Sequence, residues 1–394
     1  MEQSLREFVV AVQDAYMKSS DFSAIQTIEA GDIRVTASVA VNGPLVSIEY
    51  TAYADPFSKL QELLLGSVAY SEEDVPNLRA AYDGRGTWIH DRSRGLAVRH
   101  PGWFVPSPFP SLRVLGELRF LSQMTSDFLV ADGTSQTLNG REGREIRLKP
   151  RVPFQSQFLR ELRFPFRTAR ILFDTETYFP LRISAVPYES SPLAMLLPPK
   201  APLVLSYRDV RRDPPDALLR YTPSDDVRRF TERVLTLTEA LDLWPSELPI
   251  DTLSGLSYSA DTDHVNIIWN DASSQGQIAL EFNGSPASPE SSADTPEKPP
   301  RIILHVANYL LHSLGRKKAD IASHGTEHTL NGRPVRILDR SSLAAAGNTI
   351  PGLPHICEAF WEIDGMFWFL LSERLDEPSL LQLVTPLIES QTPR

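Results

Sequence analysis

The sequence is poor in cysteine and has no excess of positive charge. Cys357 is its one cysteine, which excludes an intramolecular disulfide and a metal site built from several thiolates. Lys and Arg number 39 against 50 Asp and Glu, for a net charge of −11. Nucleic-acid binding depends on cations that neutralise phosphates, so we expect no nucleic acid as a partner.

Long apolar runs are also absent from the sequence. No stretch approaches the roughly 20 apolar residues that span a membrane as a helix. The first residues lack the basic region and apolar core of a secretion signal. Two locations remain: extracytoplasmic, in the periplasm or cell envelope, if a leader was removed, and cytoplasmic otherwise.

The length of 394 residues predicts two domains, because single cores stop growing at roughly 250–300 residues. In the first, expected over 1–220, a helix at 1–18 precedes two stretches that alternate apolar and polar residues, Ile33–Val41 and Val46–Ala52. This alternation is typical of half-buried strands, and Asn42-Gly43 between them favours a hairpin turn. Further strand patterns follow, with a few helices inserted, including one near 56–64 and one at 112–124.

The second domain, expected over 221–394, is smaller and mixes helices with strands. Helical spacing links Val227, Phe230, Val234, Leu237 and Leu241, and a closing helix is expected to carry Leu380 to Ile388. Asp364-Gly365 predicts a hairpin within 361–371. The Pro- and Ser-rich residues 284–300 lack apolar periodicity, which predicts a flexible insertion.

One short motif occurs twice, as Thr-Leu-Asn-Gly-Arg at 137–141 and again at 329–333. In one interpretation, two unrelated hairpins use the same Asn-Gly turn. In the other, both domains contain the same strand-turn-strand unit. The sequence alone leaves both open.

Several of these patterns resemble a known family. They are the opening helix with Tyr16, the hairpin of 33–53, Tyr82–Asp91, Asn139–Glu142 and Ile171–Arg182. Together they resemble the LolA-like fold of periplasmic lipoprotein carriers and of MucB/RseB-like envelope-stress sensors. Residues 330–333 and 360–365 are similar to the small C-terminal domain of such regulators and of some sporulation lipoproteins.

The resemblance implies an α+β fold that is mostly antiparallel β. A sheet curved into a half-barrel would carry helices on its concave side, and a smaller α+β domain would follow. The concave side would hold a hydrophobic cavity for acyl chains. This chain departs from the family in its missing export signal and its long Pro-rich insertions.

Two Pro-rich apolar segments, 101–110 and 191–199, are the candidate entrance to that cavity. Proline excludes a regular helix or a central strand there. Such segments either fold back over the core or form a lid or contact patch, since contiguous exposed apolar surface marks interaction sites. The ligand-binding residues expected from these segments are Trp103, Phe104, Phe109, Met195, Leu196 and Leu197, and Trp88, Leu115 and Phe120 are expected to join them.

No motif for catalysis, for a cofactor or for a metal stands out. His324 and His328 do not follow the order of a His-Glu-x-x-His helix, and the sequence has no nucleophile elbow, phosphate loop or dinucleotide fingerprint. Arg160, Arg163, Arg167 and Arg170 form a basic stretch. That stretch is either a solvated face or a contact for anionic headgroups or an acidic partner, which would allow peripheral membrane contact.

These observations favour a non-enzymatic carrier or sensor that binds lipid, or the acyl chain of a lipoprotein, in its first domain. Its C-terminal domain would contact a protein partner. The alternative is a protein-interaction module without a lipid site, such as an anti-sigma-type regulator or an assembly factor. A hydrolase with an unrecognised site is the least favoured interpretation.

Overall fold

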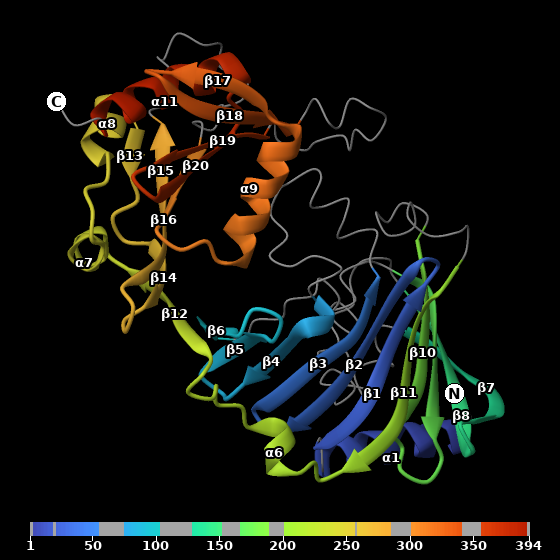
Figure 1. The fold of residues 1–394 in the computed structure, drawn as a ribbon. Coiled ribbons are helices and arrows are strands. Elements are labelled where there is room, and N and C mark those ends of the chain that lie inside the picture. Colours follow the sequence, from blue (N-terminus) through green and yellow to red (C-terminus); the bar gives the residue numbers. More distant parts are fainter. Residues whose placement is uncertain are drawn as a thin grey trace. The chain divides into compact units, whose positions relative to one another are not determined.

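The computed structural model describes residues 3–18, 21–54, 75–102, 128–151, 166–188, 201–256, 258–284, 301–340 and 356–391. As predicted, this part of the chain is mostly antiparallel β-sheet with a few helices (Figure 1). None of the helices described there is long and apolar enough to cross a membrane. Contacts divide the chain into two units, the first reaching to Val227, and the second containing Val98–His100 and Arg228 onward.

The first unit contains helix α1 and the strands up to β11, except for Val98–His100 within β6, which belong to the second unit. Its elements are α1 (Gln3–Lys18), β1 (Phe22–Ala30), β2 (Ile33–Asn42), β3 (Leu45–Ala54), the 3-10 turn η1 (Val75–Asn77), β4 (Leu78–Tyr82), β5 (Gly86–Asp91), β6 (Leu96–Pro101), β7 (Phe128–Leu138), β8 (Arg141–Pro150), β9 (Phe166–Asp174), β10 (Pro180–Pro187), β11 (Leu203–Arg212) and α6 (Asp216–Leu219).

Ten of these strands pair into one antiparallel sheet in the order β5-β4-β3-β2-β1-β11-β10-β9-β8-β7. The hairpin expected at Asn42-Gly43 is present as β2–β3, with Gly43 at φ 54°. Asn139-Gly140 joins β7 to β8 with φ values of 52° and 77°. Because Asn and Gly tolerate positive φ, the Asn-Gly dipeptide predicted the register of β7–β8. In β2–β3 the turn lies one residue later, at Gly43-Pro44, because Asn42 ends β2 and pairs with Leu45.

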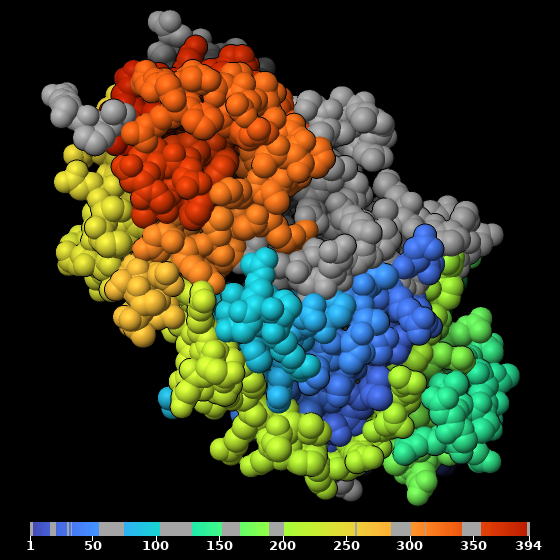
Figure 2. Space-filling model, in the orientation of Figure 1, coloured from blue at the N-terminus to red at the C-terminus, as the bar shows by residue number. Residues whose placement is uncertain are grey.

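Alternation gives this sheet one apolar and one mixed, mostly polar face. Ile28, Val35 and Tyr53 are opposite one another on β1, β2 and β3, and all three are buried. Their sequence neighbours Arg34 and Glu29 point the other way and are exposed. Figure 2 shows the blue-to-cyan strands at the surface of this unit.

The second unit contains β12 (Arg228–Leu235), α7 (Leu237–Leu243), α8 (Ile250–Gly255), β13 (Tyr258–Ala260), β14 (Val265–Asn270), β15 (Gln275–Gly284), β16 (Arg301–Ala307), α9 (His312–His324), β17 (Thr326–Leu330), β18 (Arg333–Asp339), β19 (Ile356–Ile363), β20 (Met366–Glu373) and α11 (Glu377–Ser390). Its antiparallel sheet has the order β12-β14-β15-β16-β20-β19-β18-β17, and β13 also pairs with β15.

Helices lie on both faces of this second sheet. On one face, α7, α8 and α11 bury apolar residues against alternate strand residues such as Ile278, Leu304 and Trp361. On the other face, α9 packs through Leu314 and Ile321. The closing helix was predicted from its apolar spacing. Its first turn is capped by Asp376, whose carboxylate accepts a hydrogen bond of 3.0 Å from the Ser379 amide.

One predicted helix is wrong in its first half. Residues 228–235 form strand β12, which pairs with β14, and α7 begins only at Leu237 after a capping box between Thr236 and Glu239. The spacing of Val227, Phe230 and Val234 fits a helix, but over such a short window it does not exclude a strand. Pairing with a neighbouring strand therefore decided the conformation.

Three other predictions lie outside the described residues. They concern the helices near 56–64 and at 112–124, and all but the first residue of the insertion at 284–300. The hairpins at Asn331-Gly332 and Asp364-Gly365 are confirmed as β17–β18 and β19–β20.

Candidate functional site

The apolar face of the first sheet is the surface on which the predicted ligand site depends. Nine spacings between ten strands give it a width of about 43 Å, at roughly 4.8 Å per strand. Helix α1 lies on this face, and with 16 residues it is about 24 Å long and roughly 10 Å wide. One helix of that size covers only part of the face.

Aromatic residues fix α1 to the sheet. The ring of Phe8 meets those of Phe173 and Tyr178 at centroid distances of 6.2 and 5.7 Å. The guanidinium of Arg144 lies 4.9 Å from the centre of the Phe8 ring and forms a salt bridge with Asp132. Leu5, Val9 and Val12 are buried on the same helix. The helix is therefore held over β8 and β9.

Small residues occupy much of the remaining apolar face. Ala24, Ala37, Ala80, Ala169 and Ala185 are all buried and all point to the side that α1 covers. A methyl side chain rises little above the sheet, so it leaves more depth for whatever packs on it than a leucine or phenylalanine would. On this apolar face the alanines lie among larger side chains, as where Ala37 pairs with Tyr50.

One polar pair lies within the apolar face. The amide of Gln26 donates a hydrogen bond of 3.1 Å to the Tyr207 hydroxyl, and both residues are buried. Burial raises the pKa of Tyr207, so the hydroxyl stays neutral. Tyr207 also packs edge-on against Phe179, with ring centroids 5.7 Å apart. A neutral hydrogen bond at this position is compatible with an apolar ligand.

Of the predicted ligand-binding residues, Trp88 alone lies in the described part of the chain. It is half-buried on β5, between the buried Thr87 and Ile89. The pairing of β5 with β4 places the Trp88 side chain on the face opposite α1, away from the apolar face. The other eight, Trp103, Phe104, Phe109, Leu115, Phe120, Met195, Leu196 and Leu197, lie outside the described residues, and their role stays a prediction.

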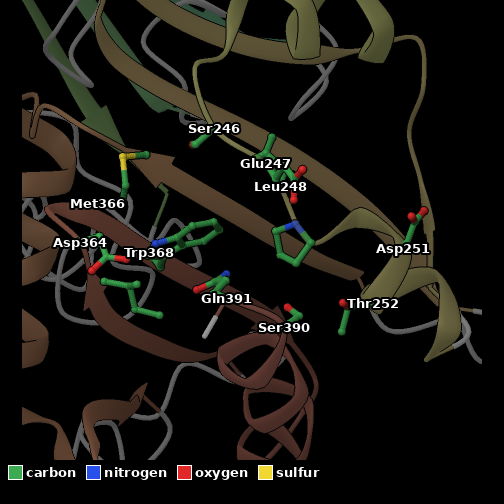
Figure 3. Close-up of a pocket in the computed structure, with 12 residues that line it drawn as sticks. Ser246, Glu247, Leu248, Asp251, Thr252, Asp364, Met366, Trp368, Ser390 and Gln391 are labelled. Carbon is green, nitrogen blue, oxygen red and sulfur yellow. The ribbon is translucent and has the colours of Figure 1, made fainter. Parts of the chain in front are cut away.

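A second candidate site is a pocket in the second unit (Figure 3). Its volume is about 490 Å³, and its walls come from three separate segments. They are the link from α7 to α8 with the start of α8, the β19–β20 hairpin, and the end of α11. The lining residues are Ser246, Glu247, Leu248, Pro249, Asp251, Thr252, Ile363, Asp364, Met366, Trp368, Ser390 and Gln391.

The pocket has an acidic rim and an apolar wall. Among the described residues, every charged side chain that lines it belongs to an Asp or Glu. Trp368 is only 3% exposed and stacks on Trp361 at 6.1 Å. Its indole nitrogen and the side-chain amide nitrogen of Gln391 are buried without a hydrogen-bond acceptor. Nothing in the sequence indicated this pocket, since Asp364-Gly365 predicts only a turn.

The densest group of buried charges lies under α9. Arg340 donates to Glu358 at 2.6 Å and lies 2.7 Å from Asp320, while the Lys317 ammonium lies 2.7 Å from the other Glu358 oxygen. Arg340 and Glu358 have side chains only 1% exposed. Two cations balance two anions, so the group joins α9 to β18 and β19 rather than offering a free charge.

Two reactive residue types are inactivated by burial. Burial and the charge of Lys317 lower the pKa of His305 to about 3, so that this imidazole is neutral at pH 7. Burial and the nearby Asp339 raise the pKa of Cys357 to about 12, which keeps it a thiol. Neither group is prepared for acid–base or nucleophilic chemistry.

Histidines 324 and 328 lie on different elements. His324 ends α9 and contacts Asp320 at 3.1 Å, whereas His328 on β17 lies 2.7 Å from Glu377. The two imidazoles are each tied to a separate carboxylate. Across the described residues, no group of three or more His, Cys, Asp or Glu is arranged to hold a metal ion.

Comparison with known proteins gives likenesses only among solved structures. No protein-family model matches the sequence, and no curated protein matches it. The MucA/MucB complex of Pseudomonas aeruginosa contains a chain 9% identical, with a TM-score of 0.30 and coverage of 95% of this chain and 96% of that chain.

Two further structures cover about half of this chain. An uncharacterised conserved protein from Thermus thermophilus is 12% identical, with a TM-score of 0.33, over 58% of this chain and 99% of that one. A LolA superfamily protein from Nitrosomonas europaea is 12% identical, with a TM-score of 0.24. The match covers 55% of this chain and 97% of that one. The similar structures thus include a LolA superfamily protein and MucB, the family that the sequence patterns resemble, and such values support no statement about function.

The buried ion pair gives a first prediction. Arg340→Met leaves Glu358 buried beside Lys317 alone, and breaking a buried pair on one side costs about 3–5 kcal/mol. The matched change Arg336→Met, on β18 just before Arg340, removes a more exposed partner of Glu327 and is expected to cost less than about 1 kcal/mol. Urea unfolding followed by tryptophan fluorescence measures both. Equal losses would contradict the structural role of the buried pair.

His305 gives a pH dependence. In the unfolded chain it binds a proton near pH 6.5, but in the folded chain only near pH 3. Between these values the unfolded state holds the extra proton, so stability falls as the pH is lowered, by up to about 1.4 kcal/mol per pH unit. We expect His305→Gln to flatten the curve of unfolding free energy between pH 6 and 4. His264→Gln, an exposed histidine, is the control and should leave the slope unchanged.

Proposed function

We propose that the protein is a non-enzymatic carrier or sensor that holds a lipid, or the acyl chain of a lipoprotein, against the apolar face of its first sheet. The observation that carries the proposal is the continuous apolar face of ten strands, of which α1 covers only part. A face of that width must be covered to be stable in water, and a bound acyl chain is one way to complete the cover.

The proposal includes several finer features. The first sheet curves into a half-barrel with helices on its concave, apolar side, and the chain divides into a domain at 1–220 and a smaller α+β domain at 221–394. The predicted residues in the 101–120 and 191–199 segments form the entrance. A lipid or lipoprotein cargo implies that the protein works in the periplasm or cell envelope.

A protein-interaction module without a lipid site is the second candidate function. The pocket of the second unit favours it, because two buried donors lack acceptors and the charged residues described at its rim are acidic. A regulator of the anti-sigma type or an assembly factor would use such a pocket for a protein partner. The two functions are compatible, since they concern different units of the chain.

The face of the first sheet opposite α1 carries a surface suited to contact with a membrane, from which the lipid would come. On β7 to β9, the exposed Leu129 is opposite Lys149, Ala131 is opposite Arg147, and Arg147 is opposite Arg170. Cations flanking an exposed leucine suit the surface of an anionic membrane. Of these basic residues, Arg170 belongs to the basic stretch that the sequence singled out.

The lipid proposal predicts a bound acyl chain in the purified protein. Native mass spectrometry after detergent-free purification should show an added mass of one lipid, identified by extraction. Ala37→Phe adds a bulky ring to the apolar face and should reduce that added mass several-fold. Ser38→Phe, on the opposite face of the same strand, should not, because its side chain points to solvent.

Overpacking at Ala37 is expected to cost about 1–3 kcal/mol, so circular dichroism must show that both variants are folded. A folded wild-type protein without added mass, which also fails to bind a fluorescent fatty acid, would contradict the lipid proposal. If one stoichiometric protein partner co-purifies instead, the second candidate function is selected.

The basic surface predicts preference for anionic vesicles. Lys149→Glu with Arg170→Glu should reduce co-sedimentation with phosphatidylglycerol vesicles by about tenfold, because each basic residue near an anionic surface contributes roughly 1 kcal/mol. Arg34→Glu with Arg208→Glu makes the same charge change elsewhere on the sheet. Equal binding of the two double variants would disprove a specific role for this surface.

A further inference from the structure

The pocket of the second unit has features that together specify one kind of occupant. We propose that it binds a lysine or arginine side chain of a partner polypeptide, together with the main chain on either side of that residue. The site is separate from the apolar face of the first sheet, so this inference does not depend on lipid binding.

The first feature is charge of a single sign. Glu247, Asp251 and Asp364 are all exposed at the rim, and none of the described residues that line the pocket is a Lys, Arg or His. Ser390 and Gln391 belong to the C-terminal end of α11, a helix of 14 residues whose last carbonyls carry partial negative charge. The pocket therefore attracts a cation and repels a phosphate or a carboxylate.

The second feature is the apolar wall between these charges. Leu248, Pro249, Ile363, Met366 and Trp368 supply the apolar part of the lining, and Figure 3 labels Leu248, Met366 and Trp368 among them. A metal ion gains nothing from such a wall. The methylene stem of a lysine or arginine packs against apolar surface while its charged end stays near the rim. A stem of three or four methylenes fits easily within about 490 Å³.

The third feature is a pair of donors without acceptors. The indole N–H of Trp368, a residue 3% exposed, has no hydrogen-bond partner, nor has the amide nitrogen of Gln391. The oxygen of Gln391 already accepts from Trp361 at 3.3 Å. A buried donor left unpaired costs about 1–3 kcal/mol. An ammonium or guanidinium group has no acceptor and cannot satisfy these donors, whereas the carbonyl groups of a peptide can.

The experiment uses the full chain and a defined probe. The probe is a fluorescein-labelled, amidated heptapeptide of alanine and valine with one central arginine, and its partner has glutamine in place of arginine. Fluorescence anisotropy should show that the arginine peptide binds at least fivefold more tightly. In a ¹H–¹⁵N spectrum, the indole signal of Trp368, assigned with Trp368→Phe, should move when the arginine peptide is added.

The control variants separate the pocket from general charge. Glu247→Gln with Asp364→Asn should weaken binding of the arginine peptide about four- to tenfold, because exposed pairs each contribute up to roughly a fivefold effect. Asp14→Asn with Asp263→Asn removes two exposed carboxylates elsewhere and should leave the affinity within twofold. Thermal unfolding of each variant shows whether the fold is retained.

Three results would overturn the proposal. One is equal binding of the arginine and glutamine peptides, and another is equal weakening in the two double variants. The third is an equal shift of the Trp368 signal with free arginine amide, which would mean that a small cation, not a polypeptide, is the occupant. Loss of lipid binding in any variant has no bearing on these outcomes, which keeps the two proposals distinguishable.

Discussion

The structure of the first unit depends on the need to cover one apolar face of a ten-stranded sheet. Every strand contributes alternate residues to that face, so its area grows with each added strand, while a helix protects a band only about 10 Å wide. Helix α1 covers part of the face, where Phe8 packs against Phe173 and Tyr178. Alanines such as Ala37 and Ala169 lie among larger side chains on the same face.

The second unit meets the same constraint differently. Its sheet is covered on both faces, by α7, α8 and α11 on one side and by α9 on the other. The α9 side buries charge as well as apolar residues, with Arg340 and Glu358 almost inaccessible to solvent. Buried pairs add little stability over apolar packing but restrict which partner an element can accept. We interpret this group as the feature that orients α9 on the sheet.

The fold was predictable wherever a local rule had a geometric consequence. Asn139-Gly140 and Asn331-Gly332 both adopt positive φ, and each joins a hairpin with the expected strands. The two motifs therefore share a turn, whatever their relationship. The same reasoning gave a wrong prediction for residues 228–235. Phe230 and Val234 fit both a helical and a strand period, and pairing with β14 determined that the segment is a strand.

The candidate sites divide in a similar way. The apolar face was predictable because period-two alternation is visible in Val35, Ala37 and Val39. Trp88 shows the limit of that reasoning: an aromatic residue was singled out for its type, but the register turned it to the opposite face. The pocket could not be found at all, since the α7–α8 link lies far in sequence from the β19–β20 hairpin and the end of α11.

By itself, the sequence determined that the chain is mostly antiparallel sheet, where its main turns lie and which residues are apolar, because turn chemistry and alternation act over a few neighbouring residues. Only the tertiary structure decided that Arg340 meets Glu358, that Trp368 lines a pocket with an acidic rim, and which side of the sheet α1 covers. Those outcomes depend on contacts between distant segments, whose free energies are set by packing and by desolvation rather than by any local pattern.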